Sequence, residues 1–227
     1  MIAIVLGSGM NSLIDFVTLD KSITYDSFID FEITTLEGHD HIIYEAKING
    51  TPLIILSGKL HLYEGYSYEQ SVAPLKYVSE KYQITNWIIT SASGALSSKA
   101  KVGVWQSISS TITLENISGL SSSTKCISHK ETEGLIYAYQ KGPALGTVAE
   151  YKMLLQFGAD LVGMSMLPES TYLNSIGVKP LLYSLPVCNY YPIDYNIFEP
   201  SHEQVIDETN QAIPKLVTIL DSLTTTF

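Results

Sequence analysis

Short apolar runs that end in glycine and serine most constrain what this chain can fold into. Residues 2–6 read IAIVL, a continuous β-branched run of the kind found in strands buried on both faces of a sheet. Residues 7–9, Gly-Ser-Gly, end that strand. A second buried strand is predicted at residues 87–90, ending at residues 91–94. Strands buried on both faces need helices on both sides of the sheet, so the pattern predicts an α/β fold.

The rest of the chain alternates between strand and helix patterns. Residues 41–48 and 51–57 are extended runs around Asn49-Gly50, which favours a type I′ hairpin because both central positions need positive φ. Further strands are predicted at residues 102–114, 136–139, 161–164 and 180–187, and the serine-rich residues 118–128 are predicted to form a surface loop. Helices are predicted at residues 67–83, 147–157, 168–176 and 201–223. We therefore expect a single α/β domain over residues 1–227, with a mixed central sheet flanked by helices.

Capping residues and prolines indicate where these helices begin, end or bend. Thr147 followed by Glu150 fits a capping box, and Gly177 is placed to end the helix before it. Pro74 is expected to kink or shorten the first helix, and Pro214 to bend or break the last one.

Composition excludes several classes of partner. Apolar residues make up 45% of the chain and charged residues 16%, so the chain should fold despite a net charge of −10. All 13 basic residues are lysines and 23 residues are acidic, which argues against a nucleic-acid partner. No apolar run approaches the roughly 18 residues of a membrane span. With two cysteines that lack metal-ligand spacing and no signal-peptide pattern, we expect a cytoplasmic protein.

Four segments at predicted strand ends combine small residues with hydroxyl or free N–H groups. They are residues 7–9, 57–61, 91–94 and 163–165. Because loops at strand ends of such a sheet meet at one crevice, together they predict a site for a small tetrahedral oxyanion. Each segment alone has an ordinary structural explanation. Residues 7–9, for example, lack both the third glycine of a dinucleotide fingerprint and the lysine of a P-loop.

Three further motifs resemble the trimeric purine nucleoside phosphorylase family, which also includes methylthioadenosine phosphorylase. Residues 61–66 (HLYEGY) are similar to its His-x-Tyr-Glu-Gly-Tyr signature. Residues 142–150 (GPALGTVAE) match its Gly-Pro-x-x-x-Thr-x-Ala-Glu segment, and residues 158–169 (GADLVGMSMLPE) its Gly-Ala-Asp-x-Val-Gly-Met-Ser-x-x-Pro-Glu signature. The matches run from Ile4 to about Val205, so the resemblance covers nearly the whole chain.

This resemblance implies a nucleoside phosphorylase-like fold and a homotrimer. It also implies a pentosyltransferase of purine salvage that cleaves a purine (deoxy)ribonucleoside reversibly to free base and ribose 1-phosphate. Inorganic phosphate is then the co-substrate, with no further cofactor and no metal. The partners expected from it are a purine nucleoside and phosphate.

The resemblance also assigns roles by position. The phosphate-binding positions are Ser8, His39, Lys59, His61, Ala92 and Ser165. The nucleoside-binding positions are Tyr63, Leu145, Gly146, Met164, Cys188, Asn189 and His202. Among all of these, His61, Asn189 and His202 are the candidate catalytic residues.

Three positions depart from the family pattern. Lys59 replaces the phosphate-binding arginine, so that a bidentate fork becomes a point charge. Gly146 replaces the purine-selecting glutamate, which predicts shallow discrimination between inosine and adenosine. Cys188 replaces the asparagine that donates to N7 of the purine. The neighbouring Asn189 is the candidate substitute, but only if the strand end bulges or its register slips.

Three functions stay open on this basis. The first is a purine nucleoside phosphorylase with altered base contacts. The second is a phosphorylase for another nucleoside, such as methylthioadenosine. The third is a catalytically feeble homologue that binds a nucleoside or phosphate. Phosphate-dependent release of free base distinguishes the first two from the third.

Overall fold

The computed structural model describes residues 1–35, 38–119, 126–128, 133–193 and 201–224. These residues form one mixed sheet in the order β10-β6-β8-β9-β5-β1-β4-β3-β2, with β7 paired to β6. The strands are β1 Ile2–Leu6, β2 Thr18–Thr24, β3 Ile42–Ile48, β4 Thr51–Ser57, β5 Asn86–Ala95, β6 Gln106–Thr113, β7 Cys126–Ser128, β8 Leu135–Tyr139, β9 Leu161–Gly163 and β10 Leu181–Asn189. The α-helices are α1 Tyr68–Ser71, α2 Ala73–Tyr82, α3 Val148–Gln156, α4 Leu167–Ser175 and α5 His202–Thr224. Three short 3₁₀ helices are η1 Asn11–Phe16, η2 Tyr25–Ser27 and η3 Leu62–Glu64.

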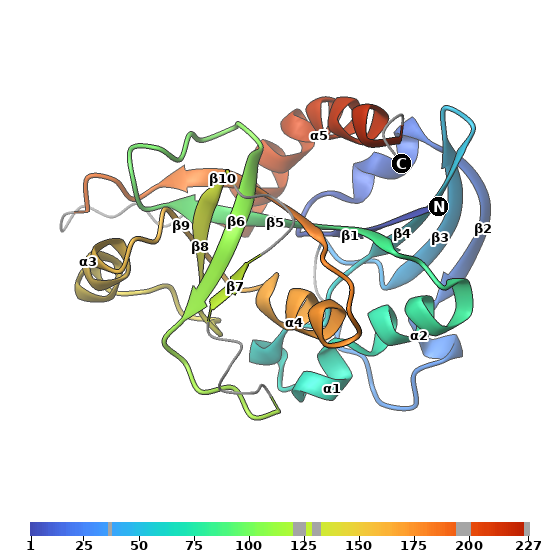
Figure 1. Ribbon diagram of the computed structural model, residues 1–227, viewed down its shortest axis with the longest axis horizontal. Coiled ribbons are helices and arrows are strands. Elements are labelled where there is room, and N and C mark those ends of the chain that lie inside the picture. Colours follow the sequence, from blue (N-terminus) through green and yellow to red (C-terminus); the bar gives the residue numbers. More distant parts are fainter. Residues whose placement is uncertain (36–37, 120–125, 129–132, 194–200, 225–227) are drawn as a thin grey trace.

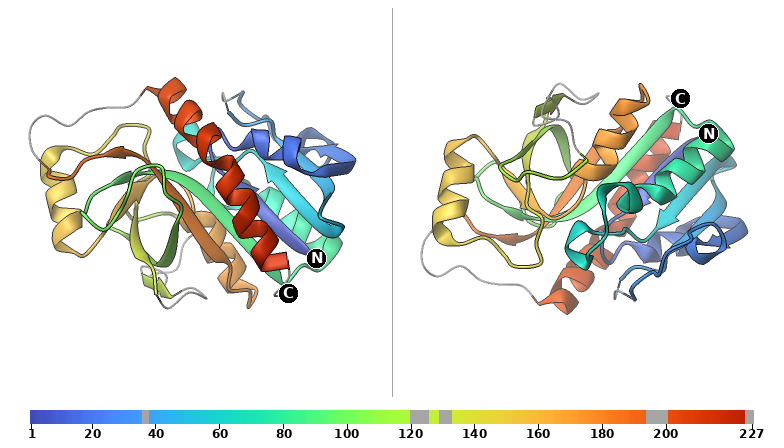
Figure 2. Two further views of the ribbon diagram at one scale, coloured as in Figure 1. Left: turned by 90° about the horizontal axis from the view of Figure 1, so that it is seen from above. Right: turned by 90° about the horizontal axis from the view of Figure 1, so that it is seen from below.

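Helices cover both faces of the sheet, as the apolar strand β1 requires. In Figure 1, α5 lies above the sheet and α1, α2 and α4 lie below it; Figure 2 shows the two faces in turn. Side chains of β1 alternate between two cores, since Ala3 and Val5 pack toward α2 and α4 while Ile4 and Leu6 pack toward α5. The sequence pattern of β1 therefore fixes its central place in the sheet.

The carboxyl-terminal half of β5 positions the candidate site. β5 pairs with β1 only as far as Ile89, and beyond that point it pairs with β10 and β9. Because β10 also pairs with β6, the strands β5, β10, β6, β8 and β9 close on one another, while β1 to β4 continue as an open sheet. The segment 91–94 lies at this junction.

Most predicted elements are confirmed, including the hairpin of β3 and β4 with Asn49 and Gly50 at positive φ. The Thr147 capping box is present. Several details of the prediction are wrong. The strand predicted to end at Ser91 continues to Ala95, because β9 and β10 supply it with hydrogen-bond partners. α5 runs without a break through Pro214, so the predicted break is absent, while the alternative of a bend stays a prediction.

Three further differences concern surface elements. The helix predicted over residues 67–83 is two helices, α1 and α2, separated at Val72, with Pro74 in the first turn of α2. Residues 126–128, assigned to a loop, form β7 against β6. The strand β2 was not predicted, since its side chains are nearly all exposed and show no apolar alternation.

Candidate active site

A cavity of about 310 Å³ lies where β5, β9 and β10 meet. Its volume is close to the lower limit for small-molecule sites, which is about 300 Å³. Its wall includes Ser8, His61, Ala92 and Ser165, one residue from each of the four small-residue segments. The loop after β1, the loop after β4, the middle of β5 and the end of β9 therefore come together.

Ser165 is the centre of a buried polar network on the cavity wall. Its Oγ lies 3.0 Å from Ser91 Oγ, which lies 3.2 Å from the Tyr137 hydroxyl. The Tyr137 hydroxyl also explains why residue 163 is a glycine, because a Cβ on Gly163 would lie 2.1 Å from that hydroxyl. These contacts fix the Ser165 hydroxyl before any ligand arrives.

His61 is held by Glu64, three residues further along the chain. Glu64 Oε1 accepts hydrogen bonds from the His61 backbone N–H at 2.8 Å and from His61 Nδ1 at 2.9 Å. Burial alone would raise the pKa of Glu64, but hydrogen bonds from His61 and Thr34 outweigh it and lower the pKa. Since an ionised carboxylate only accepts, Nδ1 carries a proton and Nε2 is the ring nitrogen available to a ligand.

His39 links the loop that carries Ser8 to the loop that carries Lys59. Its Nδ1 accepts from the backbone N–H of Lys59 at 2.9 Å, and its Nε2 lies 3.2 Å from Ser8 Oγ. In the neutral ring Nε2 then carries the proton and donates to the Ser8 hydroxyl. His39 does not line the cavity itself, so it acts on a ligand through Ser8.

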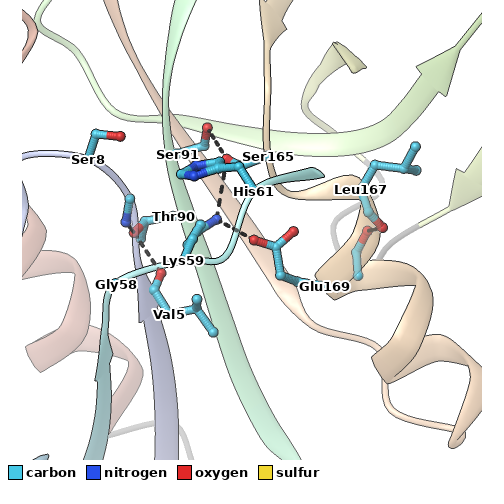
Figure 3. A network of polar contacts seen from close by, with 12 residues as sticks. Val5, Ser8, Gly58, Lys59, His61, Thr90, Ser91, Ser165, Leu167 and Glu169 are labelled. Atoms are coloured by element: carbon cyan, nitrogen blue, oxygen red, sulfur yellow. Dashed lines mark hydrogen bonds and ion pairs between the residues drawn. The ribbon is translucent and has the colours of Figure 1, made fainter. Parts of the chain in front are cut away.

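Lys59 differs from its predicted position. It is not part of the cavity wall; its Nζ lies 2.9 Å from Glu169 Oε1 of α4 and donates to Ser165 Oγ at 3.4 Å. Figure 3 shows the ammonium between these two partners. Both side chains of the pair are buried, and burial lowers the pKa of Lys59 while Glu169 opposes that shift. Lys59 therefore lies behind Ser165 with the Glu169 carboxylate as its ion-pair partner, and its contact with phosphate stays a prediction.

Tyr151 lines the cavity, whereas Gly146 does not line it but lies directly against the Tyr151 ring. A Cβ on Gly146 would lie 2.3 Å from Cε1 of the Tyr151 ring, so the ring occupies the space that any side chain at 146 would need. The Gly146 N–H donates to the Tyr151 hydroxyl at 3.1 Å. Leu145 and Met164 also line the cavity, and so does Tyr63, whose ring stacks on His61 with centroids 4.7 Å apart.

The two adjacent candidates on β10 face opposite ways. Cys188 lines the cavity, whereas Asn189 is exposed and binds the backbone of Tyr191, with its Nδ2 donating to the Tyr191 carbonyl at 2.8 Å. The register of β10 against β5 does shift between Pro186 and Cys188, yet this bulge leaves Cys188 on the cavity side. In this structure Asn189 therefore does not line the cavity, and its contact with the base stays a prediction.

One predicted residue lies beyond what the structure describes. His202 begins α5, but its side chain is outside the described residues. Val205, three residues later, lines the cavity, so the start of α5 is near it.

Sequence reasoning gave no role to three important residues. Glu64 was visible in the HLYEGY motif as an acid three residues after a histidine, which is a capping-box spacing. Tyr151 and Glu169 had no such signal, because their partners Gly146 and Lys59 are recognised only from side-chain packing.

Comparison with known proteins finds relatives that are all purine nucleoside phosphorylases among those described below. No family model matches the chain. The chain is 26% identical to purine nucleoside phosphorylase of Rattus norvegicus over 247 residues, covering 95% of this chain and 85% of that protein. It is also 26% identical to purine nucleoside phosphorylase 1 of Bacillus subtilis over 206 residues, covering 79% of this chain and 76% of the relative.

Solved structures agree with these relatives. Isoform 2 of purine nucleoside phosphorylase from Schistosoma mansoni, in complex with cytosine and ribose-1-phosphate, superposes with a TM-score of 0.84 at 25% identity. The match covers 99% of this chain and 89% of that one. The Schistosoma mansoni enzyme in complex with inosine has the same fold, with a TM-score of 0.80 at 24% identity and coverage of 97% and 88%.

Proposed function

The chain belongs to the purine nucleoside phosphorylase family, and we propose that it cleaves the N-glycosidic bond of a purine (deoxy)ribonucleoside with inorganic phosphate. The products are the free base and ribose 1-phosphate. The observation that carries this proposal is the meeting of Ser8, His61, Ala92 and Ser165 on one cavity wall. Hydroxyl groups and an imidazole at that end suit a tetrahedral oxyanion, and the flatter aromatic end suits a heterocycle.

The anion end stabilises positive charge on the sugar by holding phosphate beneath it. As the glycosidic bond breaks, C1′ of the ribose gains oxocarbenium character, which the phosphate anion stabilises before one of its oxygens forms the new bond. Hydroxyl hydrogens of Ser8 and Ser165 donate to the phosphate oxygens. His61 presents Nε2 to the phosphate, while Glu64 holds its Nδ1 from behind.

The sugar is expected to lie against Tyr63 and Met164, both of which line the cavity. The electron pair of the broken bond passes to the purine, which leaves as an anion or takes a proton at N7. Cys188 and the phenols at the base end are the groups available to donate there. Because a thiol is a weak donor, this half of the catalysis is the weaker one.

The assembly and the location stay predictions. We expect a homotrimer from the family, and a cytoplasmic protein from the cysteine content of the sequence. Within the part of the chain that the structure describes, no helix is both long and apolar enough to cross a bilayer.

The test is release of free base from a panel of nucleosides, with and without inorganic phosphate. We expect inosine, guanosine or adenosine to be cleaved only when phosphate is present, with one ribose 1-phosphate formed for each base. Cleavage restricted to methylthioadenosine would select the second function considered above. Saturable nucleoside binding by calorimetry, with no turnover on any substrate, would overturn the proposal in favour of a binding protein.

A further inference from the structure

The ion pair between Lys59 and Glu169 lies directly behind the cavity wall. Lys59 Nζ is 2.9 Å from Glu169 Oε1, and the two side chains are only 2% and 6% exposed. Neither residue lines the cavity. Two buried charges are costly to remove from water, and a pair of apolar side chains of similar volume is often no less stable. Stability alone therefore gives no reason for charges at these two positions.

The Lys59 ammonium connects this pair to the cavity. It donates to Ser165 Oγ at 3.4 Å, and Ser165 does line the cavity. Figure 3 shows the ammonium between the Glu169 carboxylate and the Ser165 hydroxyl. In the described part of the chain, the buried Glu169 Oε2 has no hydrogen-bond partner. The carboxylate is therefore held through the contact of its Oε1 with Lys59.

The polarity of the hydrogen bonds around Ser165 is set by its neighbours. Ser91 Oγ donates its one proton to the Ala92 carbonyl at 2.8 Å, so at 3.0 Å it accepts from Ser165 Oγ. Burial raises the pKa of Tyr137 to about 12, so this phenol keeps its proton and donates to Ser91. An ammonium only donates, so Ser165 accepts from Lys59. The Ser165 proton is left to point to Ser91 or to a ligand.

We propose that Glu169 is a positioning residue for phosphate binding: it holds the Lys59 ammonium on Ser165, which keeps the Ser165 hydroxyl proton available to the phosphate. The inference rests on the proposed function and names a residue behind the site on which that function depends. An anionic phosphate oxygen is a stronger acceptor than the neutral Ser91 hydroxyl, so the Ser165 proton turns to it. The Ser165 oxygen meanwhile still accepts from Lys59.

The charge of Glu169 matters because it keeps Lys59 a donor. Burial lowers the pKa of Lys59, and the Glu169 carboxylate opposes that shift. Without the carboxylate, a buried ammonium is costly and tends to lose its proton. A neutral amine can accept a hydrogen bond, and Lys59 would then compete with phosphate for the Ser165 proton.

Replacing the carboxylate by an amide tests this role. Glu169→Gln keeps the shape of the side chain and removes its charge. We expect the KM for phosphate to rise about tenfold or more, as for one lost hydrogen bond to a charged group, while the KM for inosine changes much less. An unchanged or lower KM for phosphate would overturn the inference, because Lys59 and Ser165 would then not depend on Glu169. Equal rises in both KM values would also contradict it.

A double-mutant cycle tests the route through Ser165. Ser165→Ala removes the hydroxyl that Lys59 contacts, so Glu169→Gln should raise the KM for phosphate far less in that background than in the natural protein. If the two effects simply multiplied in the double variant, Glu169 would act on phosphate independently of Ser165, and the proposed route would be wrong.

A matched control is available in Asp160, a second buried carboxylate outside the cavity wall. Asp160 accepts from Ser97 Oγ at 2.7 Å and from the Ile136 N–H at 3.1 Å. Asp160→Asn should lower the free energy of unfolding without raising the KM for phosphate relative to that for inosine. The same rise as in Glu169→Gln would mean that loss of any buried carboxylate produces the effect, and the inference would fail.

A second variant keeps the test decisive if Glu169→Gln does not fold. Lys59→Met combined with Glu169→Leu removes both charges together, so no unpaired charge stays buried and the chain should fold. We expect this variant to bind inorganic phosphate about tenfold more weakly than the natural protein, measured by calorimetry. Phosphate binding as tight as in the natural protein would show that the ion pair has no role in it.

Calorimetry also separates failure of this inference from failure of the proposed function. If the natural protein binds phosphate but releases no base from any nucleoside, the proposed function fails, and weaker phosphate binding in Glu169→Gln still supports the positioning role. If the natural protein cleaves nucleosides and Glu169→Gln binds phosphate as tightly as it does, phosphorolysis stands and the positioning role is overturned.

Discussion

The two ends of the cavity differ in charge. Near Ser8 and Ser165, which we call the anion end, ionisable side chains are paired with carboxylates. Near Tyr151 and Tyr190, which we call the base end, the lining side chains are neutral. At the anion end, His61 is paired with Glu64, and Lys59 behind Ser165 is paired with Glu169. At the base end, Tyr151 and Tyr190 fill the space left by two glycines. Under the proposed function, the ionisable groups lie where phosphate would be held, and the neutral groups lie where the heterocycle would be recognised.

The difference shows which kinds of change each end tolerates. A buried ion pair is costly to break, because the remaining charge has no solvent to replace its partner. Removing a neutral hydroxyl at the base end costs one hydrogen bond and leaves no unpaired charge. Substitutions at the anion end should therefore cost more, in stability and in rate, than those at the base end.

The largest effect is expected from Lys59→Ala, which leaves Glu169 buried without its cation. We expect a loss of about 3–5 kcal/mol in the free energy of unfolding, measured by urea denaturation at neutral pH. The control is Lys47→Ala, because Lys47 pairs with Asp20 at 2.7 Å with both side chains nearly half exposed. It should cost less than about 1 kcal/mol. Equal losses in the two variants would show that the Lys59 pair is not buried in solution.

The second effect concerns rate. His61→Asn keeps an amide that donates to Glu64 but removes Nε2 from the phosphate, so kcat/KM should fall by about 10² to 10³. Nucleoside binding without phosphate, measured by calorimetry, should change far less than kcat/KM, because His61 is expected to contact the phosphate and not the nucleoside. If nucleoside binding collapsed while the phosphate dependence stayed normal, His61 would belong to the base end.

A smaller effect should appear in the pH dependence of stability. The pKa of Glu64 is lowered in the folded protein, so its contribution is fully present above its unfolded pKa of about 4.3 and is lost as pH falls through the folded pKa. Glu64→Gln should therefore be less stable than the natural protein by about 1.5 kcal/mol at pH 7. The two unfolding curves should begin to approach each other as pH falls below about 4.3, and they should meet only below the folded pKa of Glu64. A gap that stays constant with pH would mean that Glu64 contributes through packing alone.

The sequence predicted the anion end better than the base end for a physical reason. Ser8, His61 and Ser165 belong to short segments at strand ends, and the sheet topology alone brings such segments to one edge. The ion pair of Lys59 was not predicted, because its partner Glu169 is 110 residues away in the sequence and no local pattern joins them.

The base end depends on packing between positions that sequence periodicity does not relate. Gly146 was recognised as a missing carboxylate, but nothing in the sequence said that the Tyr151 ring occupies the vacated space. The same limit applies to β5, whose length depends on β9 and β10 as partners and not on its own residues. Local patterns predicted the positions of β1, the hairpin and α3, since each is specified by residues within one segment.

The smallest effect is expected at Asn189, which faces the surface although the adjacent Cys188 faces the cavity. Asn189 is exposed and its amide is bonded to the Tyr191 backbone, while Cys188 beside it lines the base end. Asn189→Ala should change kcat/KM for inosine and adenosine by less than about twofold, since surface substitutions cost at most about 0.5 kcal/mol. Cys188→Ala removes a thiol from the cavity wall, so it should lower kcat/KM severalfold, as expected for one lost hydrogen bond. Steady-state kinetics of the two variants in parallel decide the matter. A large loss in Asn189→Ala with little change in Cys188→Ala would mean that β10 turns its other face to the base in the working enzyme, and the neutral base end described above would have to be rebuilt around an amide.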